Sequence, residues 1–217
     1  MPNLPVAVGK SGLIHYIQEE RLTMHSMPPG VRNLLIATIA AFMLQLATGG
    51  GMIASLALWP LQANFMPWQL ITYAFLHGSI AHLAINMYAL WLFGRELEML
   101  MGYKAFLQLY FASVLSAALM QLLAMGYSGA VYPTIGASGG VFGLLLAYAM
   151  FFPNRIIVLL IPPIPLPAWL FVILYAVIEL MLGVTGTEAG VAHFAHLGGM
   201  IGGYIVIRHW RRRGRLK

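Results

Sequence analysis

The chain has 217 residues, of which 60% are hydrophobic and only 8% are charged, and its formal net charge is +6. A soluble domain usually carries about 25% charged residues, so the composition excludes an ordinary soluble protein and predicts an integral membrane protein of one domain. The absence of cysteine excludes disulfides and thiolate chemistry. All six acidic residues are glutamates, so no aspartate is present for catalysis or metal binding.

Six apolar segments approach the roughly 20 residues that a helix needs to cross a bilayer. The predicted spans are 31–50, 80–99, 104–124, 136–152, 167–185 and 191–208. We expect residues 1–30 to form a short cytoplasmic lead without the features of a cleavable signal peptide. The membrane domain is then 31–208, and 209–217 is a basic cytoplasmic tail. The sequence thus predicts an all-α, polytopic bundle of six transmembrane helices.

Every lysine and arginine falls on one side of these six spans. The basic residues are Lys10, Arg21, Arg32, Arg95, Lys104, Arg155, Arg208, Arg211, Arg212, Arg213, Arg215 and Lys217. The positive-inside rule therefore predicts that both termini are cytoplasmic. This distribution explains the positive charge by topology and by contact with anionic lipid, and it argues against a nucleic-acid partner.

The connection at 51–79 is too long for a tight turn and too apolar for a solvated loop. Pro60 and Pro67 interrupt helices, and Trp59 and Trp68 are typical of the membrane interface. We expect a loop embedded in the outer leaflet, although a seventh span is the alternative. A second proline-rich run, Pro162–Pro167, predicts a rigid turn between the fourth and fifth spans.

Polar residues gather at the starts of the second, fourth and sixth spans, which the predicted topology places near the outer face. His82 and Asn86 are four residues apart and share one helix face. Ser138 begins the fourth span and His196 lies near the start of the sixth. Polar groups inside a span are costly and usually face a cavity or a partner. We interpret Ser138 as a nucleophile, His196 as its base, and His82, Asn86 and the Ser138 backbone N–H as oxyanion donors.

No carboxylate stands out as a partner for His196. The chain has no aspartate, and only Glu188 lies close to His196 in the sequence, so a Ser-His dyad is favoured over a triad. His77, His82 and His193 offer an alternative as metal ligands together with His196. Since no acidic ligand has a suitable position, we expect neither a metal nor a cofactor.

Glycines explain how two helices bring Ser138 and His196 together. Gly139 and Gly143 are four residues apart in the fourth span, and Gly199 and Gly203 are four apart in the sixth. Such small-xxx-small faces allow close approach of backbones in membranes. Phe142 lies one turn beyond Ser138, where its ring can stack on the His196 imidazole. General helix packing is the alternative reading of the glycines.

These motifs together resemble the rhomboid family of intramembrane serine proteases. The resemblance rests on Gly136-Ala137-Ser138-Gly139, on His77, His82 and Asn86, on His196 with Gly199 and Gly203, and on the turn at 93–98 followed by Gly102. It covers nearly the whole chain and is similar to the bacterial type with six spans. One departure concerns the Trp-Arg pair that the family has in its first loop. Because 51–79 contains no arginine, this pair is not evident here.

The resemblance implies that Ser138 and His196 are catalytic and that His82, Asn86 and Ser138 form the oxyanion hole. The residues implied to support them are His77, Phe142, Gly136, Gly139, Gly199, Gly203 and Glu98. Glu98 would tie the turn between the second and third spans together. The implied partners are transmembrane protein substrates and lipid, in a bacterial inner membrane, with the active site open to the outer face.

Two other functions stay open from the sequence. A catalytically silent rhomboid-like protein would bind membrane helices without cutting them, but such proteins typically lack the serine or the histidine. A transporter or channel with a polar cavity is favoured by one feature, Glu179 within the fifth span. The sequence assigns no role to Glu179 or to His193.

Overall fold

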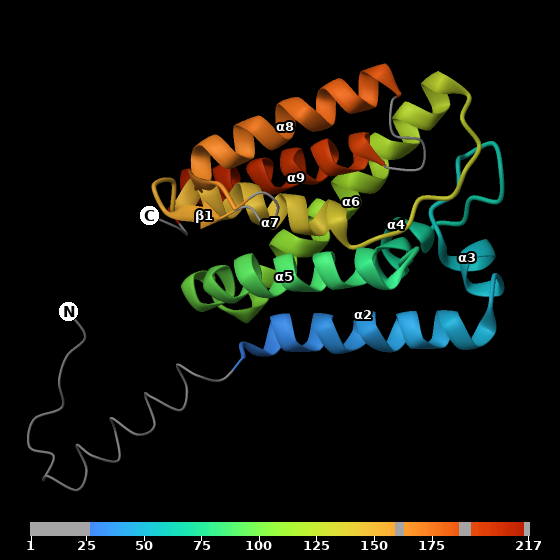
Figure 1. Ribbon diagram of the computed structural model, residues 1–217, viewed down its shortest axis with the longest axis horizontal. Helices are drawn as coiled ribbons and strands as arrows, with labels where there is room; N and C mark the ends of the chain where they lie inside the picture. The colour runs from blue at the N-terminus through green and yellow to red at the C-terminus, as the bar shows by residue number, and fades with distance from the viewer. Residues whose placement is uncertain (1–26, 159–162, 187–191, 215–217) are drawn as a thin grey trace, which may run out of the picture.

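The computed structural model describes residues 27–158, 163–186 and 192–214. Within these ranges, six helices of 14 or more residues form the molecule (Figure 1). They are α2 (Pro29–Thr48), α5 (Ile80–Met101), α6 (Tyr103–Ser128), α7 (Ser138–Phe151), α8 (Ala168–Thr185) and α9 (His193–Arg212). Each coincides with a predicted span to within a few residues, so the all-α, polytopic bundle is confirmed.

The core lies between α6, α7 and α9. Along α6 one face is buried from Phe106 to Met125, and nine of the 14 residues of α7 are buried. Figure 1 shows α2 beside α5 at one side of the bundle and α8 beside α9 at the other. In this arrangement α7 is the central helix of the bundle.

The outer helices expose apolar side chains, as expected where lipid replaces water. On α8 only Ala168, Val172 and Glu179 are buried, whereas large residues such as Ile178 and Val184 are exposed. By length and composition, α2, α6 and α8 qualify as membrane spans among the described helices. A fourth qualifies if α5 is taken together with the short helices before it, which it meets at a bend of 100°.

The other two helices fail this test for understandable reasons. With 14 residues α7 is about 21 Å long, short of the roughly 30 Å hydrocarbon core, but it is enclosed by its neighbours. The other, α9, ends with His209, Arg211 and Arg212 in its last turn, which lowers its mean hydropathy. That all six helices cross the membrane stays a prediction.

The connection between α2 and α5 folds back on the bundle instead of crossing it. It contains α3 (Gly51–Leu56), α4 (Gln69–Thr72) and a 3-10 turn, η1 (Tyr73–Phe75). The buried Gln69 side chain holds this segment by donating to the carbonyls of Ser55 and Asn64. Its helices have three to six residues, so they do not form a seventh span.

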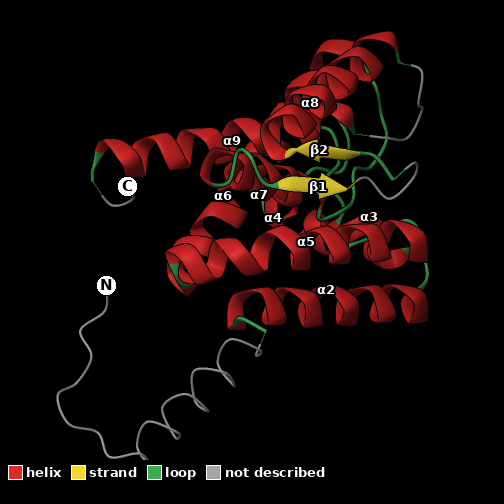
Figure 2. Ribbon diagram, turned by 60° about the vertical axis from the view of Figure 1, so that its left-hand side comes forward, coloured by secondary structure: helices red, strands yellow, loops and turns green. Residues whose placement is uncertain are grey.

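A small antiparallel hairpin joins α7 to α8, where the sequence predicts only a rigid turn. Strand β1 (Ile156–Val158) pairs with β2 (Pro165–Pro167), and Figure 2 shows the hairpin at the start of α8. Two prolines fit in β2 because a two-stranded ribbon consists of edge strands, which do not need every backbone N–H. The first proline of the run, Pro162, lies outside the described residues.

Glu98 has a different role from the one the resemblance implies. Its carboxylate accepts hydrogen bonds from the backbone N–H groups of Gly30 and Val31, at 2.7 and 2.8 Å, so it caps the start of α2. A carboxylate at a helix N-terminus is favoured by the helix dipole. The Glu98 side chain therefore ties α5 to α2, whereas at the turn between α5 and α6 it is the Glu98 backbone carbonyl that accepts from the Gly102 N–H, at 2.8 Å.

The predicted domain boundaries fall inside helices. The boundary between 30 and 31 lies in the first turn of α2, and the boundary between 208 and 209 lies in the last turns of α9. Most of the expected N-terminal lead, 1–26, lies outside the described residues. The part of the basic tail that is described continues α9 as a helix to Arg212.

Candidate active site

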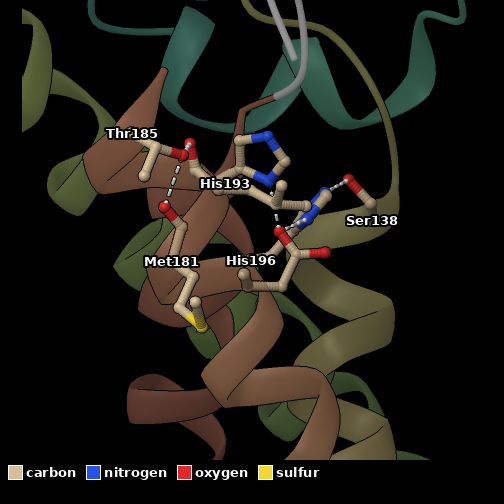
Figure 3. Close-up of polar contacts among 7 residues, drawn as sticks. Ser138, Met181, Thr185, His193 and His196 are labelled. Atoms are coloured by element: carbon tan, nitrogen blue, oxygen red, sulfur yellow. Dashed lines mark hydrogen bonds and ion pairs between the residues drawn. The ribbon is translucent and has the colours of Figure 1, made fainter. Parts of the chain in front are cut away.

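Ser138 and His196 meet where α7 and α9 begin. Ser138 Oγ lies 2.8 Å from His196 Nε2, a hydrogen-bond distance, and a dashed line marks this contact in Figure 3. Ser138 is the first residue of α7 and His196 is the fourth of α9, so each side chain projects from a rigid first turn. A hydroxyl in this position is able to pass its proton to the imidazole.

The plane of the His196 ring is fixed by an aromatic stack. Phe142, one turn along α7 from Ser138, stacks on His196 with ring centroids 4.3 Å apart and an interplanar angle of 12°. Tyr175 of α8 packs against Phe142, with ring centroids 5.5 Å apart. The imidazole is therefore held between elements of the fold instead of rotating freely.

Two glycine pairs bring the backbones of α7 and α9 into contact. A Cβ at Gly199 would collide with the carbonyl oxygen of Gly139, and one at Gly203 would lie 2.7 Å from the carbonyl oxygen of Gly143. Real Cβ atoms do not approach that closely, so side chains here would push the helices apart. The separation of Ser138 and His196 thus depends on residues without side chains.

The adjacent glycines of α9 form a second contact, with α6. A Cβ at Gly198 would lie 2.8 Å from the carbonyl oxygen of Ser116, and one at Gly202 would lie 2.6 Å from the Ser116 Cβ. Consequently α9 is packed closely on two sides. This position fixes where the His196 side chain enters the site.

His82 reaches the site because Gly136 has no side chain. Gly136 adopts φ = 129°, a conformation that L-residues rarely adopt, and a Cβ there would lie 2.9 Å from His82 Nε2. His82 Nδ1 accepts from the Gly78 N–H at 3.4 Å. Because a neutral imidazole has one donor and one acceptor nitrogen, His82 Nε2 then carries the hydrogen, as an oxyanion donor requires.

His77 lies behind these groups and is fully buried. Its Nε2 accepts from the Ala137 N–H at 3.4 Å, and its ring meets that of His82 edge-on with centroids 4.9 Å apart. Its backbone is also held by the Gln45 side chain, which bonds to the His77 N–H and carbonyl. This geometry agrees with support for the loop that precedes Ser138.

Asn86 and the start of α7 provide further donors. Asn86 Nδ2 donates to the His82 carbonyl at 2.9 Å, and its second amide hydrogen is free for a partner in the cavity that Asn86 lines. The first N–H groups of a helix have no partner within it, so the Ser138 N–H and the positive end of the α7 dipole face the same space.

A carboxylate stands beside His196, contrary to the expectation from the sequence. Glu179 Oε2 of α8 lies 2.9 Å from His196 Nδ1 and 2.7 Å from His193 Nδ1. Figure 3 shows the His196 ring between His193 and Ser138. Glu179 is distant from His196 along the sequence, so it is not an obvious partner. The packing of α8 on α9 brings the two side chains together. The only earlier signal was that it is an acidic residue inside an apolar span.

The same contact changes the metal argument. The ligand atoms of Glu179, His193 and His196 all lie within 4.8 Å of one another and are buried. The expectation that no acidic ligand is suitably placed is therefore wrong. Glu188, the glutamate that the sequence singled out, lies outside the described residues.

These groups open into a cavity of about 800 Å³ between α5 and α8. Its wall includes the side chains of His82, Asn86, Ser138, Glu179 and His196, together with Thr134 and the tyrosines Tyr88, Tyr132 and Tyr175. Apolar residues of α5, the loop before α7, α7, α8 and the hairpin line the remainder.

The sequence that forms this site matches a known protein family. A family model described as the Rhomboid domain matches residues 64–213, more than half of the chain. The chain belongs to the rhomboid family. The match spans α4 to α9, and hence all the residues that form this site.

Several curated rhomboids are similar in sequence. Rhomboid protein 1 of Saccharomyces cerevisiae, a mitochondrial protein, is 34% identical over 61% of this chain and 38% of its own length. The rhomboid protease GluP of Bacillus subtilis is 30% identical over 63% of this chain and 25% of its own. The rhomboid protease GlpG of Yersinia pestis is 29% identical over 54% and 41%. The chain spans less than half the length of these relatives.

Proposed function

We propose that this rhomboid is an intramembrane serine endopeptidase that cuts other membrane proteins. The observation that carries the proposal is the 2.8 Å contact between Ser138 Oγ and His196 Nε2, at the wall of a cavity between membrane helices. The relatives named as rhomboid proteases support it. A half-buried serine with its base, set among oxyanion donors, has the parts that acyl transfer needs.

In the first step Ser138 attacks the carbonyl carbon of the scissile peptide bond. His196 Nε2 takes the hydroxyl proton as the bond from Oγ to carbon forms, and the carbonyl oxygen becomes an oxyanion. His196 then gives this proton to the leaving amine as the carbon–nitrogen bond breaks. The products are an acyl-enzyme, in which the N-terminal fragment is esterified to Ser138, and a released C-terminal fragment with a free amino terminus.

The oxyanion is stabilised by donors that are in place before the reaction. His82 Nε2–H, the free Asn86 amide hydrogen and the Ser138 N–H approach the same region from α5 and α7. Removing one such donor typically costs about 10²- to 10³-fold in kcat. In the second step His196 takes a proton from water as the water oxygen attacks the ester carbon, and it returns that proton to Ser138 Oγ as the ester bond breaks.

The cavity favours substrates that are themselves membrane helices. A helix in lipid hides its backbone in internal hydrogen bonds, so a substrate must unwind locally to present a carbonyl to Ser138. We place its entry between α5 and α8, which both line the cavity. We expect the end of α8 and the loop after it to act as a gate, with glycines that allow motion; Gly183 and Gly186 are described, whereas 187–191 lies outside the described residues.

The proposed setting is a bacterial inner membrane, with both termini in the cytoplasm and the site open to the outer face. The one-sided distribution of lysine and arginine supports this orientation. Transmembrane substrates and lipid are the proposed partners.

The test uses purified protein in liposomes with a fluorescent reporter that contains a transmembrane segment. Wild type is expected to cleave the reporter, and Ser138→Ala and His196→Ala are expected to lose at least about 10³-fold in kcat. Reporter binding without cleavage by wild type would assign the protein to the silent helix binders. Near-normal cleavage by Ser138→Ala would refute the assignment of the nucleophile.

A further inference from the structure

Glu179 is an anomaly on a helix that otherwise faces lipid. It is one of three buried residues of α8 and the only charged one, with 6% of its surface exposed. A carboxylate at such a position is costly unless it is paired and hydrogen-bonded. Its partners are on α9, and both contacts involve the same oxygen, Oε2.

The contacts determine which nitrogen of each histidine carries hydrogen. An ionised carboxylate accepts hydrogen bonds and does not donate them, so the Nδ1 atoms of His193 and His196 that face Oε2 are the protonated ones. In a neutral imidazole the other nitrogen is then the acceptor. For His196 that nitrogen is Nε2, the atom 2.8 Å from Ser138 Oγ.

We infer that Glu179 is a positioning residue that holds His196 in the form able to accept the Ser138 proton. This inference rests on the proposed function and adds a third member to the Ser138–His196 dyad. Glu179 stays ionised throughout. When His196 takes the proton, the imidazolium faces a carboxylate at 2.9 Å, which stabilises the charge that develops in the transition state.

His193 orients the carboxylate for this role. Its hydrogen bond to Oε2 is aligned, whereas the N–H of His196 points off the line to that oxygen and finds no aligned acceptor among the described residues. Such bonds often tighten only when substrate is bound. Glu179 Oε2, which His193 holds in place, therefore lies beside His196.

The spacing fits direct hydrogen bonds better than a metal centre. Zinc ligands at about 2.0–2.2 Å in a tetrahedron are roughly 3.3 Å from one another. Glu179 Oε2 is 2.7 and 2.9 Å from the two nitrogens, so the three groups would have to separate to admit an ion. Metal binding is included as an outcome of the test.

Glu179→Gln is the decisive variant, because it keeps the size of the side chain and removes its charge. We expect kcat for the liposome reporter to fall about 10²-fold or more, with KM changed less than about threefold. The rate of labelling of Ser138 by a fluorophosphonate should fall in parallel. If Glu179 only held α8 and α9 together, its replacement would lower stability and leave the rate per folded molecule unchanged.

The pH profile gives a readout that a structural role does not move. Without the carboxylate, protonated His196 loses its counter-charge, so the acidic limb of kcat/KM should move to lower pH. The other groups that face His196 are unchanged in this variant: His82 of α5, Ser138 and Phe142 of α7, Tyr175 of α8 and His193 of α9.

Glu98→Gln is the matched control, the same replacement of a buried glutamate far from the site. It should lower thermal stability but keep the wild-type kcat and pH profile. An equal loss of kcat in both variants would overturn the inference, as would wild-type kcat and pH profile in Glu179→Gln. Loss of wild-type activity on chelation, restored by Zn²⁺, would assign the cluster to a metal and also overturn it.

The two proposals fail separately. If wild type cleaves the reporter, Ser138→Ala does not, and Glu179→Gln is unaffected, only the role of Glu179 is wrong. If wild type neither cleaves the reporter nor reacts with the fluorophosphonate, the proposed function itself fails.

Discussion

Gly199 matters at the scale of single residues because it has no side chain at the place where two helices touch. Its Cα faces the Gly139 carbonyl, one residue beyond Ser138. A methyl group there has no room unless α9 moves away from α7. Such a shift would move His196 with it, since His196 lies less than one turn earlier on the same helix.

Gly199→Ala should therefore impair both stability and reactivity. We expect a loss of about 1–3 kcal/mol in the free energy of unfolding and at least a tenfold slower reaction of Ser138 with a fluorophosphonate. Thermal unfolding and labelling rates measure the two effects. Gly126→Ala, on α6 with open space around it, is the matched control and should be neutral or slightly stabilising. Normal labelling in Gly199→Ala would contradict the account of the glycines.

Sequence patterns predict those site residues that lie at short, regular spacings. Ser138 and Phe142 share a helix face, and so do His82 and Asn86, which makes their arrangement readable from helical periodicity. The contact of Glu179 with His196 and His193 is different, because it depends on how α8 packs on α9. No spacing along the chain encodes that packing, so no role for Glu179 is predictable from sequence patterns.

At the scale of elements, Glu98 couples the start of α2 to the end of α5. Its two oxygens satisfy two of the N–H groups that a helix N-terminus leaves without partners. Gly30 permits this approach, because a Cβ there would lie 2.8 Å from the Glu98 carboxylate. The position of α2 against α5 thus depends on one buried side chain.

Glu98→Ala should lower the free energy of unfolding by about 2–3 kcal/mol, because it removes two hydrogen bonds to a charged acceptor. Unfolding in detergent, followed by circular dichroism, measures the change. Activity per folded molecule should stay normal, since Ser138 and His196 do not touch Glu98 or α2. A variant as stable as wild type would contradict the capping role.

Helix positions follow from hydropathy, whereas the small elements do not. All six predicted spans correspond to helices because long apolar runs admit few other structures in lipid. The hairpin of β1 and β2 was missed, since Pro165–Pro167 forms too short a strand for any periodicity to appear. The contact of the Glu98 side chain with α2 is also not readable from spacing, because its partners Val31 and Gly30 lie 67 and 68 residues away.

At the scale of the whole molecule, the polar cavity and the charged ends of the helices lie at different depths. Ser138 and His193 begin α7 and α9, whereas Arg208, Arg211 and Arg212 lie in the last turns of α9. In the proposed orientation, with the basic end in the cytoplasm, Ser138 and His196 come to the outer half of the bilayer. A substrate would therefore be cut near its outer end.

The absence of cysteine makes this orientation easy to test. Ser128→Cys, at the end of α6, should react with an impermeant maleimide added to intact cells. Lys104→Cys, at the start of α6, should react only after the membrane is opened. Labelling is read on a gel after quenching. The reverse pattern would contradict the proposed topology but would leave the geometry of the site intact.

The most direct measurement for the proposed protease is the mapping of a fluorophosphonate adduct by mass spectrometry on the purified protein. The account predicts a single modified serine, Ser138, with no adduct in Ser138→Ala and a much slower reaction in His196→Ala. A protein that does not react, or an adduct on another serine that persists in Ser138→Ala, would contradict it.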